Sequence, residues 1–141
     1  MDALRHVHTL LKPGGELIDS RPLGDGSAVA AGGRSLGRLD EREFSRELEL
    51  LDAHVAALVR GGLFEARDKR LFDVDMQFDT AAELLSEVVT WRGTVVPVRL
   101  QRAVKAAEPP FRVRLSLGLA IYSASSTGSP TRTRPASTTP P

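Results

Sequence analysis

The histidines are the first side chains of this 141-residue sequence that could bind a metal or move a proton. His6 and His8 lie two positions apart in a segment that predicts a helix. That spacing places them on different faces, so they cannot share a metal as histidines at i and i+4 do. His54 lies next to Val55 on a longer predicted helix, which is typical of a residue at the edge of a core. The histidines therefore predict no metal or catalytic site.

Acidic side chains form two further arrangements. Asp73 and Asp75 lie on one face of a predicted strand, where paired carboxylates could act as acid and base. Carboxylates that alternate with apolar residues are, however, typical of a solvated strand face. Asp19, Ser20 and Arg21 end another predicted strand, and an ion pair between the two charged residues could hold the following loop. The sequence has no cysteine, which excludes a zinc–thiolate site and a disulfide.

Length and charge restrict the class of protein. The length suits one domain, and 19 Lys and Arg nearly balance 18 Asp and Glu. A nearly neutral folded portion does not favour nucleic-acid binding, which usually requires a basic surface. The sequence contains no apolar run long enough for a spanning helix and no secretory signal at its start. We therefore expect a cytoplasmic chain that has neither a membrane nor a nucleic acid as its partner.

The composition changes near the C-terminus. Residues 123–141 are mostly Ser, Thr and Pro and include no large apolar side chain. Such a segment cannot bury enough surface to offset the entropy lost on ordering. The sequence predicts a folded portion over 1–122 and a disordered tail over 123–141.

Hydrophobic periodicity predicts the elements that position these residues. The order is helix, strand, helix, strand, two helices and strand, which indicates an α/β fold with helices laid on a small sheet. A sheet of three strands leaves an open edge, and folded proteins normally cover such an edge. A glycine-rich loop is expected over 23–39. The helices are expected over 2–11, 40–60, 80–91 and from 97 to before 109, and the strands over 16–20, 63–78 and 111–122.

Two of the predicted helices begin with a capping-box signal, in which an N-cap side chain and a glutamate three residues later bond the free amides. These pairs are Asp40 with Glu43 and Thr80 with Glu83. The helix over 40–60 also predicts packing through a single face, because its apolar residues recur every three or four positions. They are Phe44, Leu48, Leu51, Val55 and Leu58.

The turn that ends the first predicted helix is similar to one in a known family. Residues 11–15 read Leu-Lys-Pro-Gly-Gly and lead into the strand that begins at Glu16. This segment resembles the class I S-adenosylmethionine-dependent methyltransferases, in which such a turn leads from a helix into the fifth strand of a seven-stranded sheet. The resemblance covers residues 2–122, and it implies that 17–20 is the fifth strand, 63–78 the sixth and 111–122 the seventh, antiparallel one.

The resemblance also implies where a methyl acceptor would lie. Asp19 and Arg21 end the fifth strand and would stand near the substrate. The helical insertion over 78–102 lies where many members place substrate-facing elements. Trp91 in this insertion is either a stacking platform for the substrate or a packing residue of its helix.

The resemblance does not extend to the cofactor site. The family binds S-adenosylmethionine through a glycine-rich loop after its first strand and an acidic residue that ends its second strand, and this sequence matches neither. Residues 32–37 are glycine-rich but lack the spacing of a dinucleotide loop, and no predicted strand precedes them. We identify no catalytic or cofactor-binding residue and expect a truncated chain, inactive alone, that binds the cofactor weakly.

A different class of function is also compatible with the sequence. The chain could be a non-catalytic binding or assembly module that pairs with another chain through its open sheet edge. The partner would be either a missing N-terminal half that carries the first four strands or a second copy of this chain.

Overall fold

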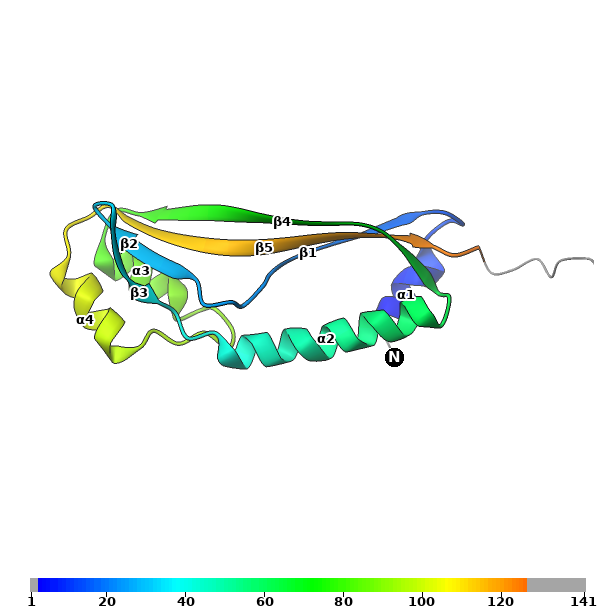
Figure 1. Ribbon diagram of the computed structural model, residues 1–141, viewed down its shortest axis with the longest axis horizontal. Coiled ribbons are helices and arrows are strands. Elements are labelled where there is room, and N and C mark those ends of the chain that lie inside the picture. Colours follow the sequence, from blue (N-terminus) through cyan, green and yellow to red (C-terminus); the bar gives the residue numbers. More distant parts are fainter. Residues whose placement is uncertain (1–2, 127–141) are drawn as a thin grey trace, which may run out of the picture.

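The computed structural model describes residues 3–126 and has a five-stranded antiparallel sheet with four helices (Figure 1). The predicted α/β class is confirmed, whereas the expected number of three strands is wrong. The strands are β1 (Glu16–Pro22), β2 (Ala28–Ala31), β3 (Arg34–Arg38), β4 (Phe64–Phe78) and β5 (Phe111–Ala124). The helices are α1 (Ala3–Leu10), α2 (Arg42–Arg60), α3 (Ala81–Val88) and α4 (Val98–Ala106).

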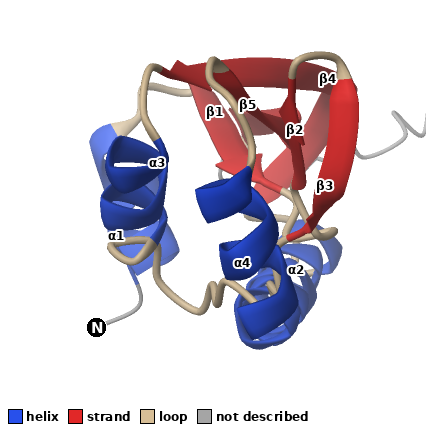
Figure 2. Cartoon of the chain, turned by 90° about the vertical axis from the view of Figure 1, so that its left-hand side faces the viewer, coloured by secondary structure: helices blue, strands red, loops and turns tan. Residues whose placement is uncertain are grey.

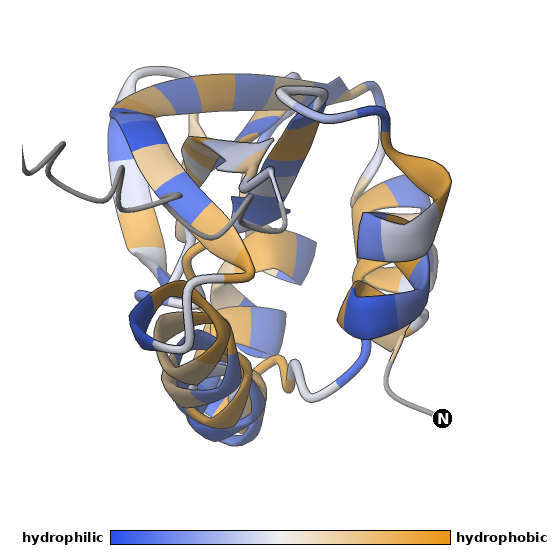
Figure 3. Cartoon of the chain, turned by 90° about the vertical axis from the view of Figure 1, so that its right-hand side faces the viewer, coloured by the Kyte–Doolittle hydropathy of each residue, from blue (hydrophilic) through white to orange (hydrophobic). Residues whose placement is uncertain are grey.

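The strand β5 is the centre of the sheet. One of its edges pairs with β4 over the whole length of that strand, from Phe78 opposite Phe111 to Phe64 opposite Ala124. Its other edge is shared, because β1 pairs with residues 117–123 and β2 with the other end of the strand. Hydrophilic and hydrophobic residues alternate along these strands (Figure 3), which is the period that predicted the long strands. All pairings are antiparallel, so β1 and β4 run in the same direction.

Residues 23–39 contain a β-hairpin instead of the expected loop. The strands β2 and β3 are joined by Gly32 and Gly33, whose φ angles of 53° and 76° suit the two-residue turn of a hairpin. The expectation that no strand precedes this glycine pair is also wrong, because β2 ends directly before it. Periodicity could not predict this hairpin, since its strands have only four and five residues.

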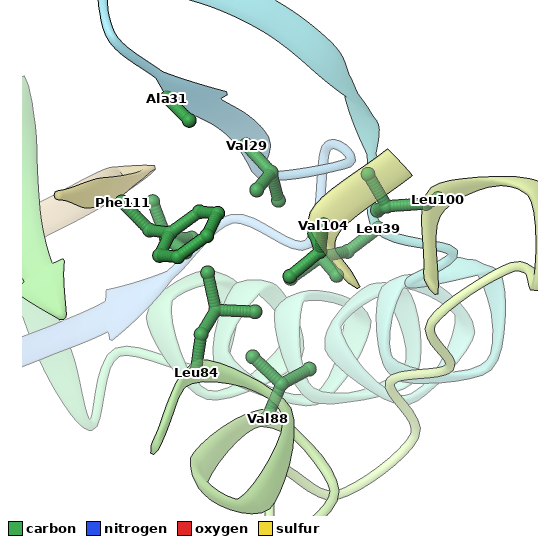
Figure 4. Close-up of a cluster of buried hydrophobic side chains, with 9 residues drawn as sticks. Val29, Ala31, Leu39, Leu84, Val88, Leu100, Val104 and Phe111 are labelled. Carbon is green, nitrogen blue, oxygen red and sulfur yellow. The ribbon is translucent and has the colours of Figure 1, made fainter. Parts of the chain in front are cut away.

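The hydrophobic core lies at one end of the sheet, where α3 and α4 approach the β2–β3 hairpin (Figures 1 and 2). Leu84 of α3 points toward Phe111 of β5 in the centre of this cluster (Figure 4). Burial of these side chains is the main force that holds α3 and α4 on the sheet. The buried members are Val29, Ala31, Leu39, Leu84, Val88, Leu100, Val104, Phe111 and Val113.

The long helix α2 packs more loosely than α3 and α4. It runs along the sheet from the hairpin end toward α1 (Figure 1). The predicted apolar stripe is present, but Leu58 is the one residue of this helix that is buried, and Leu51 remains 39% exposed. Helix α2 therefore adds little to the core and leaves space between itself and the sheet.

One of the two capping boxes is confirmed. The hydroxyl of Thr80 accepts a hydrogen bond of 3.1 Å from the backbone N–H of Glu83, and the Glu83 carboxylate reaches back to the residue before Thr80. The box predicted from Asp40 and Glu43 is wrong, because α2 begins at Arg42. The Asp40 carboxylate instead bonds the backbone and guanidinium of Arg42.

The C-terminal end of β5 shifts the predicted boundary of the folded portion. Ser123 and Ala124, which the composition assigns to the tail, belong to the strand. The rest of the tail prediction, from residue 127 onward, lies outside the described residues. Within residues 3–126, no helix is long and apolar enough to cross a membrane.

Replacing Leu84 with alanine should lower the free energy of unfolding by about 2–5 kcal/mol, because the substitution leaves a cavity in the core. Leu50→Ala on α2 is the matched control and should change that free energy by less than about 0.5 kcal/mol. Leu84 is 0% exposed, whereas Leu50 is 75% exposed. Urea denaturation followed by circular dichroism measures both variants. Equal losses would contradict this location of the core.

Candidate functional site

Three hollows lie along α2, and each is bordered by a different part of its apolar stripe. The first, here called the α1 hollow, has a volume of about 130 Å³ and lies between α1 and the last turns of α2. Its lining is almost entirely apolar and includes Leu4, Leu17, Leu51, Val55 and Phe64. Asp19 also borders this hollow, and the other two hollows contain the remaining candidate residues, Arg21 and Trp91.

Asp19 and Arg21 lie together in the second hollow, here called the Arg21 hollow, which has a volume of about 150 Å³. The guanidinium of Arg21 is 3.3 Å from the Asp19 carboxylate and donates a hydrogen bond to Asp52 of α2. The Arg21 side chain is 19% exposed. The ion pair of the second alternative is therefore present, but both of its residues lie within β1 and not beside a loop. The hydrogen bond from Arg21 to Asp52 is the contact that ties β1 to α2.

The Arg21 hollow also contains a buried donor and a phenol. The Nη1 atom of Arg21 is buried and has no hydrogen-bond partner in the part of the chain that the structure describes. Tyr122 lines the same hollow, and burial, followed by the nearby charge of Asp19, raises the pKa of its hydroxyl. Arg21 therefore lines this hollow with its charge engaged by Asp19 and Asp52, and Tyr122 adds a phenol ring to the lining.

Trp91 lies apart from Asp19 and Arg21. It lines the third hollow, here called the Trp91 hollow, which has a volume of about 320 Å³ and shares only Pro22 with the Arg21 hollow. The indole N–H donates a hydrogen bond of 3.2 Å to Glu87, one turn earlier in the chain. The ring is half-buried and packs against the core, so the packing alternative is confirmed, and the same ring also forms a wall of this hollow.

The sheet forms one side of the Trp91 hollow, and two aromatic rings face it from other elements. Met76 of β4 and Leu115 and Leu117 of β5 contribute the apolar side chains of the sheet. Phe44 comes from the first turn of α2, and Trp91 comes from the connection between α3 and α4. The lining is predominantly apolar, as in typical small-molecule sites.

Backbone hydrogen bonds hold the α3–α4 connection against the start of α2. Asp40 and Val95 exchange two of them, at 2.8 and 2.9 Å, and the Phe44 N–H donates a third to the carbonyl of Gly93 at 3.4 Å. At Gly93 φ is 65°, and an added Cβ would lie 2.7 Å from the Phe44 nitrogen. Glycine is therefore required for this close approach.

A buried glutamate holds the β1–β2 connection on the other side of the Trp91 hollow. The Glu41 carboxylate is buried and accepts hydrogen bonds from the backbone N–H groups of Gly26 and Ser27, at 2.9 and 3.0 Å, and from the Ser27 hydroxyl at 2.9 Å. These three bonds compensate for the burial of its charge. Sequence reasoning missed Glu41, because a glutamate at the start of a surface helix has no pattern that predicts burial.

The other candidate residues form no site. The solvated-face alternative is confirmed for Asp73 and Asp75. Ser116 donates to the first at 3.1 Å, and Arg114 donates to the second at 2.8 and 3.0 Å. This hydrogen bond lowers the pKa of Asp75, as expected of a paired surface carboxylate. His8 packs edge-on against an aromatic ring, and no group of metal-ligating side chains occurs among the described residues.

Comparison of the chain with protein-family models, with curated proteins and with solved structures finds no match in any of the three. A function can therefore be proposed only from the fold, from the two hollows and from the sequence resemblance.

Replacing Gly93 with alanine should push the α3–α4 connection away from α2, because the new methyl group would overlap the Phe44 backbone. Gly62→Ala is the matched control, since Gly62 has a φ of 76° and nothing within 4 Å of an added Cβ. Both variants lose about 1 kcal/mol of stability through the unfavourable φ. Gly93→Ala should lose about 1–3 kcal/mol more in urea denaturation. A similar loss for both would show that the connection is free to move.

Proposed function

We propose that the chain forms the C-terminal portion of a class I S-adenosylmethionine-dependent methyltransferase domain. The observation that carries this proposal is the direction of three strands. β1 and β4 run in the same direction and β5 runs antiparallel to both. The resemblance assigns these strands as the fifth, the sixth and the antiparallel seventh of the family. The Lys-Pro-Gly-Gly turn at 12–15 lies between α1 and β1, as the resemblance requires.

The described residues do not fit S-adenosylmethionine. The glycine pair at 32–33 forms the turn of an antiparallel hairpin, whereas a phosphate- or cofactor-binding glycine loop leads from a parallel strand into a helix. The family also uses an acidic residue at the end of its second strand, for which residues 3–126 offer no counterpart. The proposed chain therefore depends on another polypeptide for the cofactor and is inactive alone.

The contribution of this chain would be a wall of the acceptor site. Asp19 lies in the middle of β1 and Arg21 near its end, and Trp91 lies beyond Pro22 in the neighbouring hollow. Methyl transfer in this family is a direct displacement, which requires the acceptor to be held in line with the methyl group. Arg21, whose charge is engaged by Asp19 and Asp52, would form part of this wall.

A calorimetric titration of the purified chain with S-adenosylhomocysteine should give no saturable binding tighter than roughly 10 µM, because residues 3–126 offer no counterpart of the family's cofactor-binding residues. Adding a polypeptide that carries the first four strands of a class I methyltransferase should restore binding. Tight binding by the chain alone would contradict the proposal, since the remaining residues would then form a pocket by themselves.

A second proposal, a module that pairs with another chain, is favoured by the outer edge of β1. No strand among residues 3–126 pairs with this edge, and Ile18 on β1 is 60% exposed. Two other strands are outer strands as well. β4 has a bulge between Ala66 and Asp68 and carries many exposed charges, and β3 has only five residues, all of which are features that discourage pairing. The edge of β1 is therefore the one suited to a second copy or to a strand of a missing half.

Ile18→Lys should reduce self-association of the chain, because a charge on an edge strand opposes pairing. Leu71→Lys is the matched control, since Leu71 lies on β4 and is 66% exposed. Light scattering should give a mass that falls toward the monomer for Ile18→Lys and stays unchanged for Leu71→Lys. A monomeric starting protein, or an equal effect of both substitutions, would exclude self-pairing through β1.

A further inference from the structure

We propose that the Trp91 hollow binds a small neutral aromatic molecule that carries one hydroxyl group. The hollow has a volume of about 320 Å³. An apolar cavity of about 150 Å³ already accepts benzene. A molecule of one or two fused rings is therefore the appropriate size.

The shape of the lining favours a flat ring system. Met76, Leu115 and Leu117 present an apolar surface from the sheet, and Phe44 and Trp91 add aromatic rings from two other elements. Aromatic rings contact one another favourably both edge-to-face and in offset stacks. An aromatic ligand could therefore contact the rings and the aliphatic side chains at the same time.

The polar groups around the hollow favour a neutral ligand. The Glu41 carboxylate already accepts three hydrogen bonds. Arg92 donates to Glu47 at 2.9 Å, and the Trp91 indole donates to Glu87. A charged ligand would lose its hydration without gaining a free counter-ion, and such burial is costly.

The side chain of Thr94 favours a ligand that carries one hydroxyl group. It is half-buried, and within residues 3–126 its side chain makes no hydrogen bond, unlike the other polar side chains of this lining. A threonine hydroxyl can both donate and accept. A ligand hydroxyl next to Thr94 would therefore gain a hydrogen-bond partner that no other described residue occupies.

The hollow is held open before any ligand arrives. The exchange of hydrogen bonds between Asp40 and Val95 holds the Trp91 side against α2, and Glu41 holds the β1–β2 connection. Pre-organised sites lose less conformational entropy when a ligand binds. Under the proposed function this molecule is the methyl acceptor, but its binding requires only residues of this chain.

Trp91 is the only tryptophan of the chain, so its emission reports on this hollow directly. The experiment titrates the full-length chain with 1-naphthol, a neutral aromatic alcohol, and records quenching of the emission. We expect saturable quenching by one equivalent. Naphthalene-1-sulfonate has the same rings but a charge, and it should bind at least about tenfold more weakly, because no free cation in the lining compensates for that charge.

Two variants test the location. Leu117→Phe fills the Trp91 hollow and should weaken 1-naphthol binding by at least about tenfold, whereas Leu51→Phe, the same change in the α1 hollow, should leave it unchanged. Thr94→Val keeps the shape and should weaken binding about fivefold through the lost hydrogen bond. Thermal unfolding checks that each variant is folded. If Leu117→Phe does not fold, the binding measured for Thr94→Val decides the outcome.

The following results would overturn the proposal. Quenching that rises linearly to the solubility limit would mean collision without a site. Equal affinities for 1-naphthol and naphthalene-1-sulfonate would contradict the proposed preference for a neutral ligand. Unchanged 1-naphthol binding in both Leu117→Phe and Thr94→Val would place the ligand elsewhere. None of these results depends on S-adenosylmethionine, so a failure here is distinct from a failure of the proposed methyltransferase function.

Discussion

The pairing of β5 on both of its edges is the interaction on which the rest of this structure depends. β1, β2 and β4 each pair with β5, and β3 joins the sheet only through β2. The alternation of apolar and polar residues in β5 supplies a buried side chain at Phe111 and Val113, where the core helices pack. Without β5, the strands β1, β2 and β4 would have no hydrogen-bonded contact with one another. The short β2–β3 hairpin would be the one remaining pair among these strands.

The two ends of the sheet differ in how closely their helices pack. At one end, the short helices α3 and α4 each bury two apolar residues against the sheet. Along the rest of the sheet, the longer α2 buries one residue and borders hollows instead. Dense packing resists rearrangement, whereas hollows between pinned elements provide space for a ligand. The packed end therefore gives the fold its stability, and the α2 side gives it the space in which a function can reside.

The sequence predicted the elements with strong periodicity and missed those without it. The alternation in β5 extends over several residue pairs, and the apolar stripe of α2 extends over more than two helical turns. Both patterns are long enough for the local sequence alone to identify the element. The β2–β3 hairpin is too short for such a pattern, and it forms because β5 offers an edge. The adjacency of Asp19 and Arg21 follows from their spacing on one strand. The separation of Trp91 from that pair, and the burial of Glu41, depend on contacts distant in the sequence.

The position of β5 in the chain has a consequence for how the protein is made. Glu16 of β1 lies opposite Ser123, so synthesis passes through most of the chain before this pair can form. Helix α2 and the β2–β3 hairpin depend on local contacts and can appear early. β1 and β4 must instead remain unpaired until β5 leaves the ribosome. During this interval both carry exposed backbone donors and acceptors, which makes them the segments that a chaperone would need to shield.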